Sequence, residues 1–320
     1  MRDEHGTGPE GAADGLTVRV PAKVNVQLAV GGLRPDGFHG LANVFLAVGL
    51  YDEVTASPAD DLRVTVSGAD ALQVPLDDSN LAARAARLLA ERHGREPQVG
   101  LHIAKDIPVA GGMAGGSADA AGALLACDAL WGARTPRDEL LALCAELGSD
   151  VPFALVGGAA LGQGRGELLT PLETGGTFHW VFALADGGLS TPAVYRECDR
   201  LRETSGTGAG IDSVPEPRPS ERLLDALRTG DAAELAASVS NDLQAAALSL
   251  RPSLADTLKT GTAAGALAAL VSGSGPTCAF LAEDAASASE IAAALEESGQ
   301  CRAARVTTAP APGATPVGSW

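Results

Sequence analysis

The chain has 320 residues, of which 46% are hydrophobic and only 3% aromatic, and its formal net charge at pH 7 is −17. A chain of this length can bury a full core and most naturally divides into two domains, with a core built from alanine, leucine and valine. The acidic charge and the scarcity of aromatic rings exclude a protein that binds nucleic acid or anionic membranes through a broad basic or stacking surface.

The ends of the chain and its cysteines predict a cytoplasmic protein. Residues 1–15 are acidic and glycine-rich, unlike a secretory signal, and are expected to form a disordered leader. No run reaches the roughly 18 apolar residues that a membrane span needs. The five cysteines are scattered without metal-ligand spacing, so we expect reduced core residues and no metal held by the protein. The oligomeric state stays open between monomer and homodimer.

The first predicted element is a strand that begins at Leu16 and is interrupted by Pro21. Apolar and polar side chains alternate along it, which places Lys23 and Asn25 side by side on the polar face. Such a pair is most often simply solvated. A functional role for the two side chains therefore needs support from elsewhere in the chain.

A turn-rich loop over residues 31–40 follows and presents Phe38 and His39. Loops of this composition often bind ligands, although a hydrophobic plug and a capping histidine explain the two side chains equally well. Further strands are predicted over residues 44–55, 62–67, 99–104, 177–185, 267–271, 277–282 and 302–308. Helices are predicted after the caps Ser79, Ser117 and Thr135 and over residues 192–203, 221–227, 232–248, 252–259 and 285–298.

The strongest local signal is a glycine-rich segment, residues 108–118, between a predicted strand and a predicted helix. Its four glycines lack the Cβ that would keep the backbone away from a phosphate. Their N–H groups, with the positive end of the next helix, can hold a polyphosphate. Neither a Walker A lysine nor a G-x-G-x-x-G pattern is present. A turn that merely allows tight helix packing is the alternative interpretation.

Asp150 follows the predicted helix that ends at Gly148 and starts another helical turn. An aspartate in this place usually caps the helix, but it can also direct a carboxylate toward a cleft. Together with the glycine-rich segment and Lys23 it suggests phosphoryl transfer, which requires positioning, charge neutralisation and a carboxylate that orients the acceptor, with magnesium on the nucleotide. Lys23 would neutralise transferred charge or keep Asp150 ionised.

The sequence PVAGGMAGGSAD at 108–119 and SGSGPT at 272–277 resemble the two glycine motifs of the GHMP kinases, which include galactokinase, homoserine kinase and mevalonate kinase. PAKVN at 21–25, RPDGFH at 34–39 and GSDVPF at 148–153 narrow the resemblance to the kinases of CDP-methylerythritol in the non-mevalonate isoprenoid pathway. The resemblance covers residues 18–308. It implies an α+β, two-domain GHMP kinase fold, with an N-terminal domain similar to domain 2 of ribosomal protein S5 and a ferredoxin-like C-terminal domain.

The resemblance also implies ATP-dependent phosphorylation of the 2-hydroxyl of CDP-methylerythritol, with ATP and Mg²⁺. It makes Lys23 and Asp150 catalytic and assigns Asn25, Phe38 and His39 to the cytidine pocket, where the ring at 38 stacks and His39 reads the cytosine edge. The family usually has tyrosine in place of Phe38. The implied ATP-binding residues are Pro108, Val109, Ala110, Gly111, Gly112, Met113, Ala114, Gly115, Gly116, Ser117 and Ala118.

Ala110 and Ala114 stand where the family often has glycine, and we expect them at ordinary negative φ. The expected organisation is a leader (1–15), an ATP-binding domain (16–165), a substrate-side domain (166–308) and a flexible tail (309–320). Two alternatives remain. Another small-molecule GHMP kinase, such as a homoserine kinase, would not depend on the cytidine group. A catalytically inactive binding protein on the same scaffold would bind nucleotide without turnover.

Overall fold

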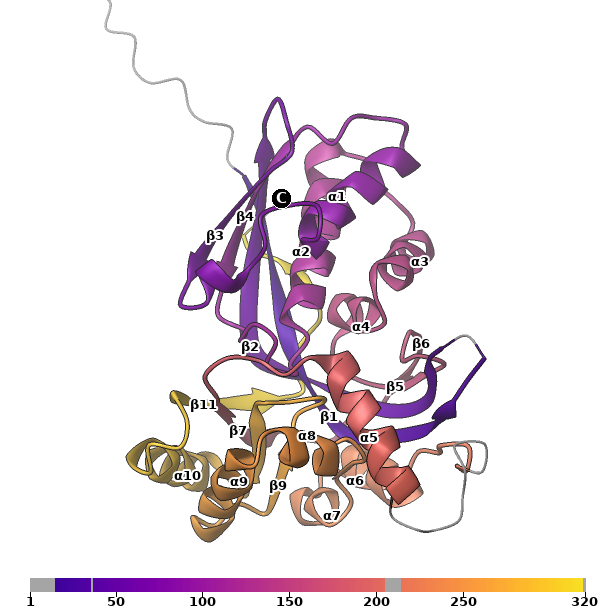
Figure 1. Ribbon diagram of the computed structural model, residues 1–320. Helices are drawn as coiled ribbons and strands as arrows, with labels where there is room; N and C mark the ends of the chain where they lie inside the picture. Colours follow the sequence, from indigo (N-terminus) through magenta and orange to yellow (C-terminus); the bar gives the residue numbers. More distant parts are fainter. Residues whose placement is uncertain (1–14, 36, 205–213, 319–320) are drawn as a thin grey trace, which may run out of the picture.

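Two β-sheets, each covered by helices, make up the part of the chain that the computed structural model describes, residues 15–35, 37–204 and 214–318 (Figure 1). The predicted leader, apart from Gly15, lies outside the described residues, and so do residues 205–213. Among the described helices, none is both long enough and apolar enough to cross a bilayer.

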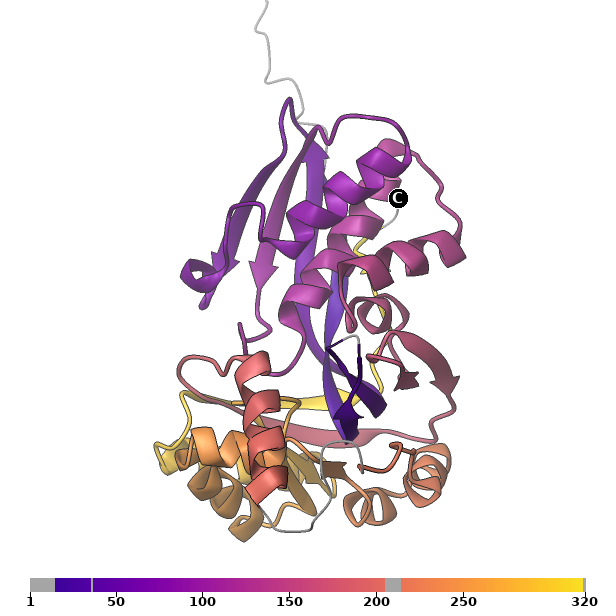
Figure 2. The ribbon, with the colours of Figure 1, turned by 45° about the vertical axis from the view of Figure 1, so that its right-hand side comes forward.

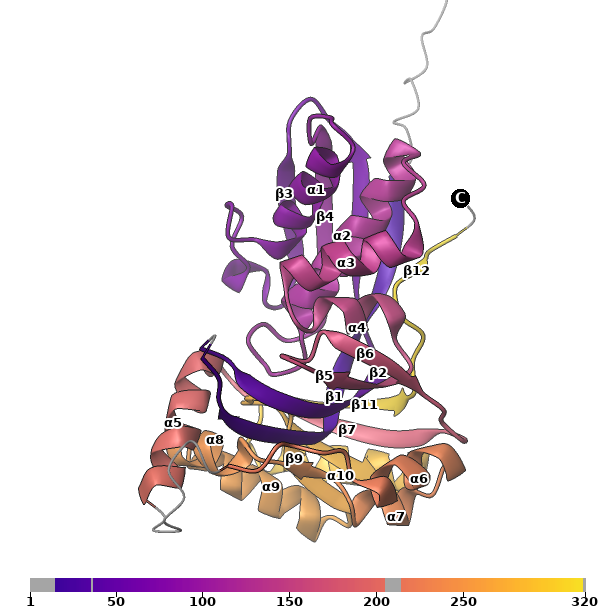
Figure 3. The ribbon, with the colours of Figure 1, turned by 90° about the vertical axis from the view of Figure 1, so that its right-hand side faces the viewer.

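The first sheet is mixed, with strand order β12-β1-β2-β4-β3, and with β5 beside β2, β6 beside β5 and β8 beside β1. The strands are β1 (Leu16–Leu33), β2 (His39–Pro58), β3 (Arg63–Gly68), β4 (Val99–Lys105), β5 (Ala159–Gln163), β6 (Leu168–Leu172), β8 (Ser240–Asn241) and β12 (Thr315–Pro316). The long antiparallel strands β1 and β2 run from the first sheet down to the second (Figure 3). Side chains at the two ends of these strands therefore serve different parts of the molecule.

One face of the first sheet is covered by helices α1 (Leu81–Arg92), α2 (Gly115–Trp131), α3 (Arg137–Leu147) and α4 (Val151–Val156), and the short 3₁₀ turn η1 (Ala71–Gln73) follows β3 (Figure 2). Helix α2 lies directly on β1 and β2. A Cβ at Gly122 would come within 2.9 Å of Val20 and 2.8 Å of Val54, so the absence of a side chain there lets the helix approach the sheet. Small residues on α2 explain how a core with few aromatic rings is close-packed.

The second sheet is antiparallel, with strand order β11-β7-β10-β9. Its strands are β7 (Phe178–Leu184), β9 (Ala268–Val271), β10 (Cys278–Ala282) and β11 (Ala303–Ala309), and the helices that accompany it are α5 (Thr191–Thr204), α6 (Glu221–Thr229), α7 (Ala232–Ala236), α8 (Gln244–Leu250), α9 (Ser253–Ala263) and α10 (Ala285–Glu297). Helical segments connect β7 to β9 and β10 to β11, which is the ferredoxin-like βαββαβ arrangement. The predicted α+β, two-domain fold is confirmed.

The predicted caps at Ser79 and Ser117 are wrong. Asn80 caps α1, because its side chain accepts hydrogen bonds from two N–H groups of the first turn. Helix α2 begins already at Gly115, so Ser117 lies inside the first turn and the N-cap is Ala114, which has no side chain able to cap. The two errors have one cause: neighbouring polar or glycine residues offer several starts, and only the packed backbone selects one.

Two further helices differ from the sequence pattern. Pro136, and not Thr135, is the N-cap of α3. The single helix predicted over 232–248 is broken into α7 and α8, with β8 between them. Asn241 lies in this break, and its side-chain amide donates to the carbonyls of Val271 and Gly273 at 2.7 and 2.8 Å. A tertiary hydrogen bond therefore overrides a continuous helical pattern.

The chain returns to the first sheet in two places that the predicted domain boundaries do not anticipate. The hairpin β5–β6 extends past residue 165 and pairs with β2. The predicted flexible tail pairs with β1 through β12, and the N–H of Val317 donates to the carbonyl of Thr17 at 2.8 Å. Ala309 and Ala311 are buried, so this segment covers apolar surface and a strand edge that would otherwise be exposed.

Candidate active site

Lys23, on β1, is the residue at which the predicted motifs meet. Its buried ammonium donates to Oδ1 of Asn25 at 2.6 Å and to the carbonyl of Gly112 at 3.0 Å, and it lies 3.8 Å from Oδ2 of Asp150. Burial lowers the pKa of Lys23, and the Asp150 carboxylate opposes that shift. The cation is thus held between the glycine-rich loop and a carboxylate.

Asp150 occupies the N-cap position of α4, but its side chain makes no capping hydrogen bond. The carboxylate is about one-third exposed and is directed to Lys23 instead of to the helix. Helix capping, the ordinary explanation for an aspartate at this position, therefore does not account for it. A partly exposed carboxylate beside a buried cation can accept a proton from an alcohol.

The two glycine motifs pack against each other beside Lys23. Gly112 has φ +79°, and a Cβ there would lie only 2.1 Å from the carbonyl oxygen of Ser272. A Cβ at Gly273 would lie 3.0 Å from the Gly112 carbonyl oxygen and 3.2 Å from Nζ of Lys23. The hydroxyl of Ser272 donates to the same Gly112 carbonyl at 3.1 Å. Glycine is required at these contacts because two backbones and one side chain share the space.

The loop ends at an uncapped helix N-terminus. Among the described residues, no acceptor covers the N–H groups of Gly115, Gly116 or Ser117. These groups and the positive end of the 17-residue helix α2 fit a phosphate. The expectation of negative φ at the two loop alanines is wrong: Ala110 has φ +51° and Ala114 has φ +61°. Each alanine costs roughly 1 kcal/mol in this left-handed region, so the surrounding contacts hold the loop against strain.

A buried ion cluster lies beneath the start of the loop. Nζ of Lys105 donates to Oδ2 of Asp52 and, at 2.8 Å, to Oδ2 of Asp119, and all three side chains are almost fully buried. Oδ1 of Asp52 accepts from the N–H groups of Asp106 and Ile107 at 2.7 and 2.9 Å. Burial by itself would lower the pKa of Lys105, but the two carboxylates raise it. Burial raises the pKa of Asp119 to about 7. The cluster ties β4 to α2, the two elements that flank the loop.

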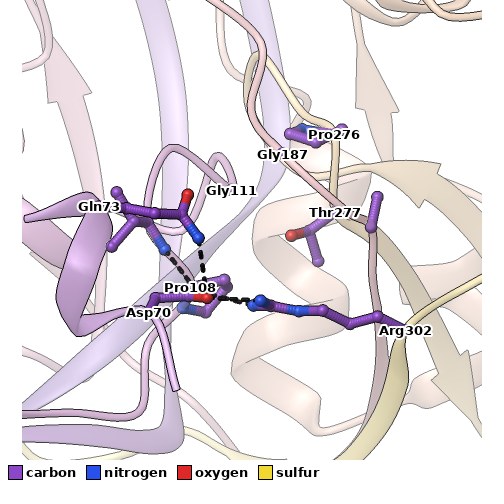
Figure 4. Close-up of a pocket in the computed structure, with 10 residues that line it drawn as sticks. Asp70, Gln73, Pro108, Gly111, Gly187, Pro276, Thr277 and Arg302 are labelled. Atoms are coloured by element: carbon purple, nitrogen blue, oxygen red, sulfur yellow. Dashed lines mark hydrogen bonds and ion pairs between the residues drawn. The ribbon is translucent and has the colours of Figure 1, made fainter. Parts of the chain in front are cut away.

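A crevice between the two sheets touches the loop from the other side (Figure 4). The carboxylate of Asp70 accepts hydrogen bonds from both terminal guanidinium nitrogens of Arg302, the residue before β11, and its Oδ2 also accepts from the N–H of Val109 at 3.2 Å. Hydrogen bonding to Arg302 lowers the pKa of Asp70. The hydroxyl of Thr277, which also lines the crevice, is buried and has no hydrogen-bond partner among the described residues. Asp70 thus connects the loop to the second sheet.

His39, at the first residue of β2, is buried against α5. Its Nε2 lies 3.0 and 3.1 Å from the two carboxylate oxygens of Asp199, and its ring stacks on Tyr195 with centroids 5.0 Å apart. Phe38 is about half exposed, and the guanidinium of Arg165 lies 5.1 Å from the centre of its ring. The two rings of the predicted loop therefore stand in different environments.

The cytidine-side residues are not all brought together. Asn25 lies beside Lys23, and its side chain bonds to Lys23 and Asn43, whereas His39 bonds to Asp199 on α5. Burial raises the pKa of Tyr195, and the carboxylate of Asp150 raises it further.

No sequence motif singles out Tyr195 and Asp199, or the buried partners Asp52 and Asp70. The one available signal is that Tyr195 and Asp199 are four residues apart in a predicted helix, which places them on one face. Within the described part of the chain, no group of three or more histidine, cysteine, aspartate or glutamate side chains is arranged to hold a metal ion.

Comparison with known proteins agrees with this geometry. Residues 80–158 match the family described as GHMP kinases N terminal domain, and residues 223–301 match the family described as GHMP kinases C terminal. The 4-diphosphocytidyl-2-C-methyl-D-erythritol kinase of Streptomyces avermitilis is 74% identical over 300 residues, which cover 94% of this chain and 99% of that protein. The kinase of the same name from Streptomyces coelicolor is 71% identical, with 94% and 98% covered.

Solved structures extend the comparison to the fold. A crystal structure of 4-(cytidine 5'-diphospho)-2C-methyl-D-erythritol kinase is 33% identical and superposes with a TM-score of 0.73, covering 92% of this chain and 99% of that one. Homoserine kinase from Cytophaga hutchinsonii has the same fold, with a TM-score of 0.71 at 19% identity and coverage of 98% and 100%. The chain belongs to the 4-diphosphocytidyl-2-C-methyl-D-erythritol kinase family of the GHMP kinases.

Proposed function

We propose that this chain transfers the γ-phosphate of ATP to the 2-hydroxyl of 4-diphosphocytidyl-2-C-methyl-D-erythritol, in the non-mevalonate route to isoprenoid precursors. The observation that carries the proposal is that Lys23 contacts both Gly112 of the glycine-rich loop and Asp150, which sets a cation between the phosphate-binding segment and a carboxylate. The 74% identity to the Streptomyces avermitilis kinase supports the choice of substrate.

Asp150 accepts the proton of the 2-hydroxyl. The hydroxyl oxygen forms the new bond to the γ-phosphorus while the bond to the departing ADP oxygen breaks. Lys23 neutralises charge on the transferred group. Asn25 fixes Lys23, because its Oδ1 accepts from Nζ while its Nδ2 donates to Asn43 at 2.6 Å. We therefore place Asn25 at the phosphoryl-transfer centre, whereas the resemblance of the sequence motifs implied the cytidine pocket.

Phe38 and His39 are proposed to bind the cytidine end of the substrate. The half-exposed ring of Phe38 offers a stacking surface, and the buried imidazole of His39 offers a hydrogen-bonding edge. Stacking does not need the hydroxyl of the tyrosine that the family usually has at position 38.

The glycine-rich loop fits the phosphates of ATP. The N–H groups of Gly115, Gly116 and Ser117 and the positive end of α2 would hold phosphate oxygens. Mg²⁺ would be held mainly by those phosphates, with the Ser117 hydroxyl as a further ligand, and it supplies neutralisation of their charge.

ADP release, coupled to an optical readout, tests the proposal with ATP, magnesium and three acceptors: the CDP-linked substrate, the same alcohol without its cytidylyl group, and homoserine. Turnover is expected with the CDP-linked substrate alone. Turnover with homoserine would move the chain to another branch of the superfamily. Binding of ATP and of the CDP-linked substrate without ADP release would identify a binding protein on a kinase scaffold.

Breaking the Asp70 contact is expected to weaken ATP binding. Asp70→Ala removes the acceptor of the Val109 N–H and the partner of Arg302, so the loop loses one fixed point. The KM for ATP should rise about fivefold, the effect of one lost hydrogen bond, with kcat little changed. Steady-state kinetics with ATP as the varied substrate measures both constants.

Arg305→Gln is the matched control for this variant. It breaks the Arg305–Asp106 pair, which also joins β11 to the first sheet but is more exposed and does not hold the N–H of a loop residue. The control should leave the KM for ATP unchanged. An equal rise in both variants would mean that the KM responds to docking of the two sheets and not to Asp70.

A further inference from the structure

Among the described residues, one ring nitrogen of His39 has a hydrogen-bond partner and the other has none. Its side chain is only 8% exposed, and Nε2 faces both carboxylate oxygens of Asp199. None of the hydrogen bonds between described residues involves Nδ1, and Nδ1 is not one of the fully buried polar atoms that lack a partner, so it remains accessible from the site. An ionised carboxylate can only accept, so Nε2 carries the hydrogen, and in neutral imidazole Nδ1 is then an acceptor. An accessible acceptor without a protein partner, on a side chain that is otherwise buried, fits a ligand that donates.

Helix α5 fixes this arrangement from two positions. Tyr195 stacks on the imidazole ring with an interplanar angle of 29°, and Asp199, one helical turn later, holds Nε2. Turning the ring over by 180° would put Cε1 where Nε2 lies and would break the hydrogen bond to Asp199. The side chain of Asp199 is only one-fifth exposed, so water competes weakly for this bond. The second domain therefore sets the tautomer of a histidine that the first domain carries.

We propose that Asp199 is a specificity-determining residue: by holding His39 with hydrogen on Nε2, it makes Nδ1 an acceptor that selects an amino-bearing pyrimidine over an oxo-bearing one. The inference rests on the proposed function, in which a cytidine diphosphate group binds at Phe38 and His39. The 4-amino group of cytosine donates a hydrogen bond, whereas the 4-carbonyl of uracil only accepts. Uracil would bring two lone pairs together at Nδ1 and leave both groups unsatisfied.

Asp199→Asn tests the role without changing the shape of the side chain. The amide oxygen of asparagine accepts from a protonated Nε2, and its NH₂ group donates to an unprotonated Nε2, so both tautomers of His39 become possible. Glu197→Gln is the matched control. It removes the same charge from the same helix, but Glu197 bonds to Arg200 and Ser249 and not to His39.

The readout is the ratio of the dissociation constants for UDP and CDP, measured by isothermal titration at pH 8 with the ATP site filled by ADP and magnesium. The unaltered protein and Glu197→Gln should prefer CDP by about tenfold or more, and Asp199→Asn should lose about tenfold of that preference. An unchanged ratio in Asp199→Asn, equal binding of both nucleotides, or no binding of CDP by the unaltered protein would overturn the inference.

Nitrogen-15 chemical shifts of the imidazole report the tautomer directly, and they do so even if Asp199→Asn fails to fold. The His39 signals are assigned by their loss in His39→Gln. The unaltered protein should show a protonated Nε2 and an unprotonated Nδ1, and a protonated Nδ1 at pH 8 would overturn the inference. Absence of ADP release from the CDP-linked substrate would instead reject the proposed function, while the tautomer and the CDP preference would still report on Asp199.

Discussion

Replacing Asp150 by asparagine is expected to lower kcat by a factor of about 10²–10⁴, the range that a positioned general base contributes. Asparagine keeps the shape of the side chain but cannot accept the proton of the substrate hydroxyl. The KM for ATP should change little, because Lys23 keeps its bonds to Asn25 and to the Gly112 carbonyl, which lie on the nucleotide side of the site. Initial rates of ADP release at varied ATP and varied CDP-linked substrate give kcat and the KM for each of the two substrates.

The same variant should leave the free energy of unfolding nearly unchanged, because Asp150 makes no capping hydrogen bond at α4 and is partly exposed. Denaturant unfolding of both proteins is therefore the control for a structural effect. An unchanged kcat would reject Asp150 as the base. A rise in the KM for ATP at constant kcat would show that the carboxylate serves mainly to organise Lys23 and the loop.

Lys105→Met is expected to lower the free energy of unfolding by about 3–5 kcal/mol, the usual cost of removing one partner from a buried ion pair. The cluster holds one ammonium and two carboxylates, all nearly inaccessible to water. Methionine leaves Asp52 and Asp119 facing each other without a cation. Urea unfolding, with circular dichroism of the native state as a check on folding, measures the difference.

Asp119→Asn is the matched control, because it leaves the Lys105–Asp52 pair balanced in charge. We expect this variant, unlike Lys105→Met, not to lower the free energy of unfolding at pH 7. A loss as large as that of Lys105→Met would show that packing, and not charge balance, explains the cluster.

The pH dependence of stability distinguishes the charge of Asp119 from its packing. Burial raises the pKa of Asp119 to about 7, above an unfolded value of about 3.9, so between these values the folded protein binds more protons than the unfolded chain. Stability from this group is therefore complete below pH 4 and is lost as the pH rises to 7. Asp119→Asn removes that loss, so its stability relative to the unaltered protein should improve over this interval.

The order of elements and the phosphate-binding segment could be predicted because they depend on local signals. Alternation along β1 places Lys23 beside Asn25, and glycines between a strand and a helix mark residues 108–118 wherever they occur. Helix starts near Ser79 and Ser117 were less predictable, since several neighbouring residues can begin a helix and packing chooses among them. The left-handed φ of Ala114 likewise depends on contacts that the loop makes after folding.

The sequence by itself determined the motifs, the two-domain α+β fold and the family to which this chain belongs, since each rests on residues close together in the chain. Tertiary structure alone decided which charges meet: Asp70 and Arg302 are 232 residues apart, and His39 and Asp199 are 160 apart. These contacts form across sheet and helix interfaces, where burial excludes water and makes a charge depend on a partner. No local pattern encodes that pairing, because the free energy that favours it exists only once both surfaces are packed.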